Sequence, residues 1–305
     1  METKIATEKI QTHAQLESQH WYDKHYKTIL FLSLFLLFIS IAYIIYTAVK
    51  TGDIMQKDVT LTGGTVITVY TDNFDLQEIE SFLFSKFSDA VVRSLTDISS
   101  GKKLGFSVET KAAAEEVKTV LEQHLGYKLN EKNSSVEYTG ASLSSSFYKE
   151  LLKAMVLAFI FMAVVVFLIF RTLVPSLAVI QAALTDIVFS LAVANIIGLK
   201  ISTAGIAALL MLIGYSVDTD ILLTNRALRR KEGALNERIF GAFKTGITMT
   251  LTALAVVLAS YFVVISPVLK QVFLILAFGL AADIVATWGV NAGILKWYCK
   301  KRNIL

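Results

Sequence analysis

Carboxylates inside long hydrophobic stretches are the residues of this chain whose type and position could do chemistry. An aspartate near the centre of a membrane-spanning helix costs roughly 2.5–3.5 kcal/mol on insertion scales, so it is seldom there without a role. At that depth the group is expected to be neutral unless a cation or water reaches it, which suits a proton carrier. The candidates for a proton relay are Asp186, Asp218, Asp220 and Asp283.

Asp218 and Asp220 are the most informative pair, because they stand two positions apart in one hydrophobic run, 202–225. Two positions correspond to about 200° around a helix, so the two carboxylates cannot lie on one face. Both faces therefore need buried or hydrated surroundings, and we expect this helix to lie centrally in a bundle. Asp218 is the strongest single candidate for proton transfer.

Further polar residues repeat at intervals of four, which places them on one face of a helix. Asp283 is followed at this spacing by Thr287 and Asn291. The preceding hydrophobic run has a similar stripe, formed by Lys244, Thr248 and Thr252. These residues either support a hydrated path or hydrogen-bond neighbouring helices and fix their packing, and the same alternative holds for Asp186 and Asp283.

The elements that must position these residues are hydrophobic helices. Hydrophobic residues make up 54% of the 305, and only 18% are charged, well below the roughly 25% usual in soluble proteins. The mean hydropathy is +0.59. About 20 apolar residues suffice to cross a bilayer as a helix. The sequence predicts six such spans, at 28–49, 151–170, 174–197, 202–225, 245–265 and 271–295.

The distribution of lysine and arginine predicts the orientation of these spans. If the N-terminus is cytoplasmic, most basic residues of the short flanks fall inside, and the two short outside loops hold only Lys200 and Lys270. We therefore expect a multi-pass protein of the cell membrane with both termini in the cytoplasm. The expected organisation is a cytoplasmic segment (1–27), a first span (28–49), an extracytoplasmic domain (50–149), a five-helix bundle (150–295) with a cytoplasmic loop at 226–244, and a basic cytoplasmic tail (296–305).

The extracytoplasmic domain has ordinary soluble composition and alternating strand and helix patterns. Gly63 and Gly64 interrupt its first strand, where we expect a bend or hinge. The order β-α-β-β-α-β predicts a ferredoxin-like α+β fold. The expected elements are strands at 58–70, 90–95, 103–109 and 135–139 and helices at 74–87 and 111–125.

Several function classes find no support in the sequence. It shows no phosphate-binding loop, no nucleophile with a base and no histidine or cysteine cluster with metal-ligand spacing. We expect no enzymatic activity, no cofactor and no metal. The net charge is +4, and the basic residues are distributed by loop, in the pattern that sets the orientation of membrane spans. We therefore expect contact with the lipid bilayer and not with nucleic acid.

Three motifs resemble the SecF half of the SecD/SecF protein-export pair of the RND superfamily, and more its archaeal branch. They are the segment 61–65 (Leu-Thr-Gly-Gly-Thr), the segment 214–226 around Asp218, and the segment 234–252 leading into the fifth span. Thr219 occupies the position of an aspartate common in bacterial SecF, whereas Asp218 matches the aspartate of the SecD motif. The resemblance covers nearly the whole chain.

The resemblance implies a SecD-like partner subunit, an association with the SecY translocation channel, and a translocating polypeptide that contacts the outer domain. It also implies that the proton motive force moves this domain and thereby assists export. Two alternatives remain. The chain could be a passive scaffold or substrate-binding subunit with structural aspartates, or a half-unit of an RND-type exporter of lipids or small molecules.

Overall fold

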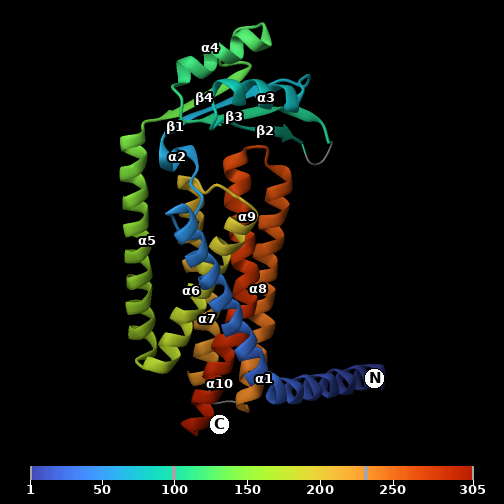
Figure 1. The fold of residues 1–305 in the computed structure, drawn as a ribbon. Helices are drawn as coiled ribbons and strands as arrows, with labels where there is room; N and C mark the ends of the chain where they lie inside the picture. Colours follow the sequence, from blue (N-terminus) through green and yellow to red (C-terminus); the bar gives the residue numbers. More distant parts are fainter. Residues whose placement is uncertain (1, 98–100, 230–232, 304–305) are drawn as a thin grey trace.

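The fold is a bundle of long helices with a small α+β domain at one end (Figure 1). The structure is a computed structural model, which describes residues 2–97, 101–229 and 233–303.

Six helical spans in the described residues are long and apolar enough to cross a membrane, as the hydrophobic runs predict. The last span consists of three consecutive segments, because a π-helical turn (η1) separates α9 from α10. The bounds are α1 (Glu2–Thr51), α5 (Ala141–Phe170), α6 (Leu173–Ile196), α7 (Thr203–Arg229), α8 (Leu235–Val263), α9 (Pro267–Val285), η1 (Ala286–Asn291) and α10 (Ala292–Lys301).

Short connections make neighbouring spans antiparallel. Arg171 has a left-handed backbone conformation (φ 52°) that ends α5, and α6 begins two residues later. Pro267 occupies the first turn of α9, where its missing N–H removes no intrahelical hydrogen bond. The predicted loop 226–244 is largely helical, since α7 continues to Arg229 and α8 begins at Leu235.

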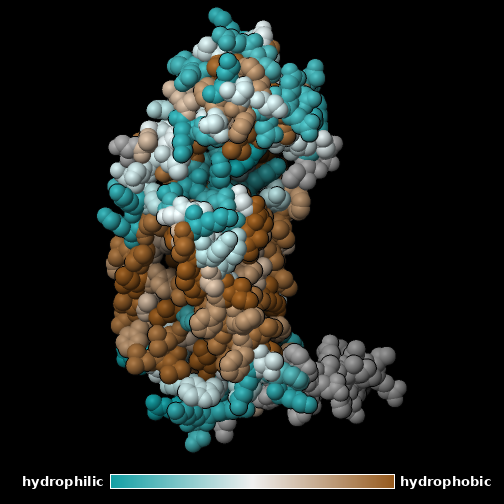
Figure 2. All heavy atoms as spheres, viewed as in Figure 1, coloured by the Kyte–Doolittle hydropathy of each residue, from teal (hydrophilic) through white to brown (hydrophobic). Residues whose placement is uncertain are grey.

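The helices divide into an inner and an outer group. Helices α6, α7 and α9 bury much of their surface, whereas α1, α5 and α8 are mostly exposed in the isolated chain. Figure 2 shows the exposed apolar side chains as a belt across the visible face of the bundle, between a polar domain at one end and polar residues at the other. This belt is the surface expected against lipid.

The α+β domain has the predicted ferredoxin-like order of elements. Its four strands pair only in antiparallel fashion within one sheet of order β2-β3-β1-β4. One face of the sheet packs on the helices around Ile67, Phe106 and Leu121, while the other face is turned toward the bundle (Figure 1). The bounds are β1 (Gly64–Tyr70), α3 (Leu76–Lys86), β2 (Val91–Thr96), β3 (Lys103–Thr110), α4 (Ala114–Leu125) and β4 (Ser134–Thr139).

The prediction of a strand over 58–70 was wrong in its first part. Residues Val59–Thr62 form a short helix, α2, and β1 begins only at Gly64. The Asp58 side chain accepts a hydrogen bond from the Val59 N–H and caps this helix. Leu61 is buried against the bundle, so local capping and tertiary contact override the β-branched composition.

The other predicted elements of the domain are correct apart from shifted ends. The first helix begins at Leu76, because the Asp75 side chain caps it by accepting hydrogen bonds from Gln77 and Glu78. The second helix begins at Ala114, three residues later than predicted.

Candidate functional site

Three buried carboxyl groups meet inside the bundle. Asp186 comes from α6, Asp220 from α7 and Asp283 from α9, and all three side chains are completely buried or nearly so. These helices are the inner group of the bundle, which explains why their polar residues face one another and not the lipid belt. We refer to Asp186, Asp220 and Asp283 as the carboxyl cluster.

Hydrogen bonds from the last span hold two members of this cluster. Thr287 Oγ1 lies 2.9 Å from Asp220 Oδ1 and 2.9 Å from Asp283 Oδ1. Asn291 Nδ2 donates a hydrogen bond of 2.7 Å to the same oxygen of Asp220. The stripe Asp283, Thr287, Asn291 thus faces α7, which brings residues of two spans together on Asp220.

The polar residues Thr287 and Asn291 belong to the π-helical turn η1, which starts three residues after Asp283. π-helical turns are rare, and they are frequently found at functional sites. All six residues of η1 are buried, and the turn packs against α1 and α6. The irregular part of the last span therefore coincides with the carboxyl cluster.

Two residues next to the carboxyl cluster were not predicted as site residues from the sequence. Thr250 of α8 donates a hydrogen bond of 3.2 Å to Asp283 Oδ2. Ser216 of α7, one turn before Asp220, lies next to Asp186 and Asp283. The spacing of four between Ser216 and Asp220 was a usable signal, whereas Thr250 stands among several threonines of one helix.

Asp186 differs from the other two carboxyl groups. Neither of its side-chain oxygens has a donor at full hydrogen-bonding distance among the described residues. Its backbone carbonyl accepts a hydrogen bond of 2.6 Å from Ser190 Oγ. A buried polar group without a direct partner is costly when it is charged, so burial favours the protonated form of the Asp186 carboxyl group.

The structure places Asp218 apart from the cluster. Its side chain is exposed on the opposite face of α7, next to the exposed Gly214 and Tyr215. The spacing of two correctly separates Asp218 from Asp220, but among the described residues α7 is covered on the side of Asp220 and open on the side of Asp218.

The stripe of α8 also points away from the cluster. Lys244, Thr248 and Thr252 are exposed, and each threonine hydroxyl donates to the carbonyl four residues earlier. Thr248, Thr252 and Tyr215 line a shallow groove of about 490 Å³ between α7 and α8. Asp218 of α7 and Lys244, Thr248 and Thr252 of α8 are thus exposed polar residues on two neighbouring helices, and we call them the polar strip.

Gly63 and Gly64 lie where the domain joins the helices, in backbone conformations of positive φ (85° and 145°). A Cβ atom at Gly63 would lie 2.3 Å from the Ala141 Cα, and one at Gly64 would lie 2.4 Å from the Thr110 carbonyl oxygen. Both positions therefore require glycine for close packing as well as for conformation.

Metal binding finds no support in the described residues, because they contain no group of three or more histidine, cysteine or acidic side chains that could hold an ion. The cluster brings carboxyl, hydroxyl and amide groups into contact inside an apolar bundle.

Comparison with known proteins gives the family. Residues 117–301 match the family model described as protein export membrane protein SecD/SecF, C-terminal. The chain is 38% identical to the protein-export membrane protein SecF of Methanocaldococcus jannaschii, over 90% of this chain and 96% of that protein. It is 37% identical to SecF of Pyrococcus furiosus, over 87% of this chain and 88% of that protein.

The fold is similar to the crystal structure of SecDF, a translocon-associated membrane protein from Thermus thermophilus, with a TM-score of 0.70 and 19% identity. That match covers 90% of this chain and 38% of the SecDF chain. Three findings agree on the family: the six apolar spans, the ferredoxin-like domain, and the SecF relatives that match along nearly their whole length. The chain is a multi-pass membrane protein that belongs to the SecF family of protein-export membrane proteins.

Proposed function

We propose that this chain acts with a SecD-like subunit beside the SecY channel, where proton flow through the bundle moves the α+β domain and assists polypeptide export. The SecF family is a family of transport subunits and not of enzymes. The observation that carries the proton-coupled form of the proposal is the carboxyl cluster of Asp186, Asp220 and Asp283.

Proton transfer needs groups that can hold a proton away from water and pass it over short distances. The contacts of 2.9 Å from Thr287 to both Asp220 and Asp283 supply such a connection. A hydroxyl has one hydrogen to donate, so it can face two carboxyl groups when one of them is protonated and donates to the hydroxyl oxygen. Moving that proton from one carboxyl to the other requires no helix to unfold.

The polar strip on α7 and α8 supports a partner subunit inside the membrane. Exposure of Asp218 to lipid would cost roughly 2.5–3.5 kcal/mol, which a neighbouring helix bundle removes by covering it. The chain aligns with only 38% of the SecDF chain, which leaves length for a SecD half in that protein. We therefore propose that the SecD-like subunit packs on the strip around Asp218, Thr248 and Thr252.

The proposed orientation puts both termini in the cytoplasm and the α+β domain outside. It is supported by the lysine and arginine residues near the domain-distal helix ends, including Arg226, Arg229 and Lys300. In this orientation the domain lies on the side where polypeptide emerges.

The decisive experiment measures export into energised membrane vesicles, with and without a proton gradient, at matched protein levels. Asp220→Asn and Asp283→Asn keep the side-chain shape but cannot ionise. We expect both to assemble with the partner and to export at the gradient-free rate even when the gradient is present. We expect the same of Asp218→Asn, whose carboxyl faces the proposed partner.

The matched control is Asp72→Asn, which changes an exposed aspartate of the α+β domain and should leave gradient-dependent export intact. Full gradient-dependent export in both cluster variants would show that the aspartates only fix packing. The chain would then be a passive scaffold or substrate-binding subunit. A half-unit of an RND-type exporter would instead move its cargo without a SecD-like partner.

A further inference from the structure

The chain segment that leads from α1 into the α+β domain is bound to the bundle. The Asp58 N–H donates to the Ile201 carbonyl (3.0 Å), and the Ile201 N–H donates to the Gln56 carbonyl (2.6 Å). Asn195 of α6 adds hydrogen bonds to the Gln56 N–H and the Ile54 carbonyl. This segment and the α6–α7 loop therefore form one continuous junction beneath the domain.

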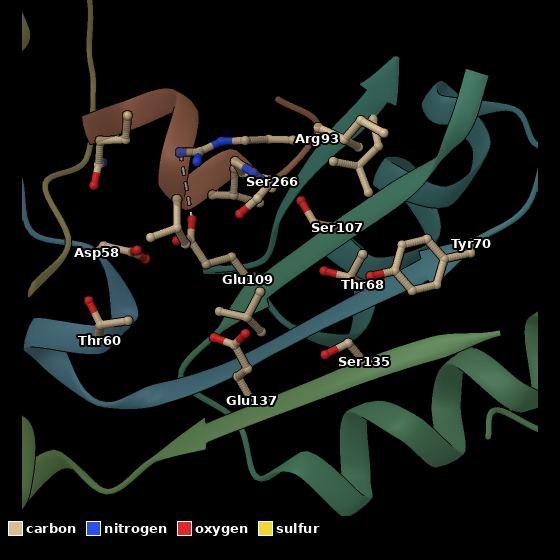
Figure 3. A pocket seen from close by; sticks show the side chains of 17 residues that line it. Asp58, Thr60, Thr68, Tyr70, Arg93, Ser107, Glu109, Ser135, Glu137 and Ser266 are labelled. Atoms are coloured by element: carbon tan, nitrogen blue, oxygen red, sulfur yellow. Dashed lines mark ion pairs between the residues drawn. The ribbon is translucent and has the colours of Figure 1, made fainter. Parts of the chain in front are cut away.

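A polar cavity of about 390 Å³ lies beside this junction, between the sheet and the start of α9. Figure 3 shows Asp58 and Glu109 facing each other at one end of it, with Arg93 above. The two carboxyl groups lie close enough for one to donate a hydrogen bond to the other when a proton is present. Asp58 belongs to the bundle-bound segment, whereas Glu109 belongs to β3, so this contact crosses from bundle to domain.

Basic side chains from the bundle and from the α+β domain lie close to Glu109. Lys200 Nζ, in the α6–α7 loop, lies 2.9 Å from Glu109 Oε2, and Arg93 of β2 lies 3.7 Å from the same oxygen. The Lys200 side chain is 29% exposed and the Arg93 side chain 45%, so the contact of Glu109 with Lys200 is better shielded from water than its contact with Arg93. Glu137 of β4 lines the same cavity.

The two carboxyl groups are placed to hold one proton between them. Burial, the hydrogen bond to Glu109 and the charge of Glu109 raise the pKa of Asp58 from 3.8 to about 8. Burial also opposes the ionisation of Glu109, but the hydrogen bonds from Asp58 and Lys200 outweigh it and lower the pKa of Glu109. The proton therefore resides on Asp58, which donates it to the Glu109 carboxylate.

We propose that Asp58, Glu109 and Lys200 form a proton-sensitive latch that docks the α+β domain on the bundle. With the proton present, Asp58 and Glu109 attract each other and Lys200 neutralises the single negative charge. Loss of the proton places two carboxylates face to face, and their repulsion releases the domain. The latch is independent of the proposed relay, because it lies outside the bundle and shares no residue with the carboxyl cluster.

The direction of the pH effect follows from proton linkage. The docked state keeps a proton on Asp58 up to a pH of about 8, whereas a solvated aspartate loses it near 3.8. Over this range the docked state binds up to one more proton than the released state. The equilibrium constant for docking therefore falls by up to ~10-fold per pH unit between about 4 and 8.

The test measures the distance between the domain and the bundle in the full chain in lipid nanodiscs. Spin labels at Gln123→Cys on α4 and Val263→Cys on α8 report this distance by pulsed electron paramagnetic resonance, and both sites are exposed. The native Cys299 is buried, and single-cysteine samples measure its background. We expect a narrow distance distribution at pH 5 and a broader, shifted one at pH 9.

Two variants separate the latch from a general effect of pH. Asp58→Asn cannot ionise, so its distribution should stay narrow at both pH values. Glu137→Gln changes another carboxylate of the cavity and should keep the wild-type response. If Asp58→Asn does not fold, Asp58→Ser retains an N-cap residue for α2 and should also show no pH response.

The latch proposal is contradicted if the distance distribution of the wild-type protein is the same at pH 5 and pH 9. It is also overturned if Asp58→Asn still responds to pH, or if Glu137→Gln abolishes the response. Each of these results leaves the export assay of the cluster variants unaffected, so the two proposals fail separately.

Discussion

Asp220 and Asp283 share one hydroxyl group, since Thr287 Oγ1 lies 2.9 Å from an oxygen of each. The two aspartates come from α7 and α9, and Thr287 belongs to the π-helical turn η1. This single side chain therefore connects two membrane spans through their carboxyl groups. Its replacement tests whether that connection matters for stability and for export.

We expect Thr287→Val to destabilise the protein by about 1–3 kcal/mol, because valine has a similar shape but leaves buried carboxyl oxygens without their donor. The thermal unfolding midpoint in detergent and the gradient-dependent export rate should both fall. The matched control is Thr119→Val on α4, whose hydroxyl is exposed and donates to the Glu115 carbonyl of its own helix. Equal stability of the two variants would contradict a role for the shared hydroxyl.

Substitutions at two glycines can distinguish packing within the chain from packing against a partner subunit. A side chain at Gly246 would meet Trp288 and Thr219, whereas Gly214 is exposed and has open space around it. We expect Gly246→Leu to lower the unfolding midpoint of the isolated chain. Gly214→Leu should leave that midpoint unchanged but reduce co-purification of the SecD-like subunit. Normal recovery of the partner with Gly214→Leu would place the interface elsewhere.

The orientation can be tested with single cysteines at exposed positions. An impermeant thiol reagent applied to intact cells should label Gln123→Cys on α4 but not Ala234→Cys, just before α8. After the cells are opened, both should react, which controls for accessibility. Labelling of Ala234→Cys in intact cells would reverse the proposed topology.

The α+β domain should fold on its own when it is expressed as residues 64–140. This range contains the whole sheet and its hydrophobic core, whereas a longer product from residue 55 exposes Met55 and Leu61, which are buried against the bundle. We expect a cooperative thermal transition and mixed α/β circular dichroism. An unfolded or aggregated product would contradict this boundary.

The isolated domain should also lose stability in acid through Asp89. Burial opposes its ionisation, but hydrogen bonds from the Lys111 N–H (2.7 Å) and Thr110 Oγ1 (3.0 Å) outweigh it and lower the pKa of Asp89 below 3.8. The stabilisation is present above pH 3.8 and is lost as the pH falls through the lowered value. Asp89→Asn should therefore unfold more easily at pH 7 and lose less stability in acid than the wild type does. Parallel pH profiles would exclude this contribution.

The sequence predicted the six spans and the β-α-β-β-α-β order because long apolar runs and regular alternation are strong signals. It failed at Val59–Thr62, where a helix cap and burial against the bundle decide the local conformation. The π-helical turn also left no sign, since its residues continue the α-helical spacing of Asp283 and Thr287.

The candidate sites were predictable in residue type but not in arrangement. Helical geometry separates Asp218 from Asp220, but it does not say which of them faces the interior. The pair Asp58 and Glu109 was missed because the two residues lie on separate elements and each looks like an ordinary solvated acid in the sequence. Only the approach of the sheet to the α6–α7 loop brings them together.

The close approach of Gly63 to Ala141 has a mechanical consequence. Gly63 ends the incoming chain of the domain and Ala141 starts α5, so both covalent connections pass through one point. A body attached in this way behaves as a lever with a single pivot, free to tilt but poorly able to slide. A pull on its far end would therefore first tilt the domain about this point, and only then act as a force on α1 and α5.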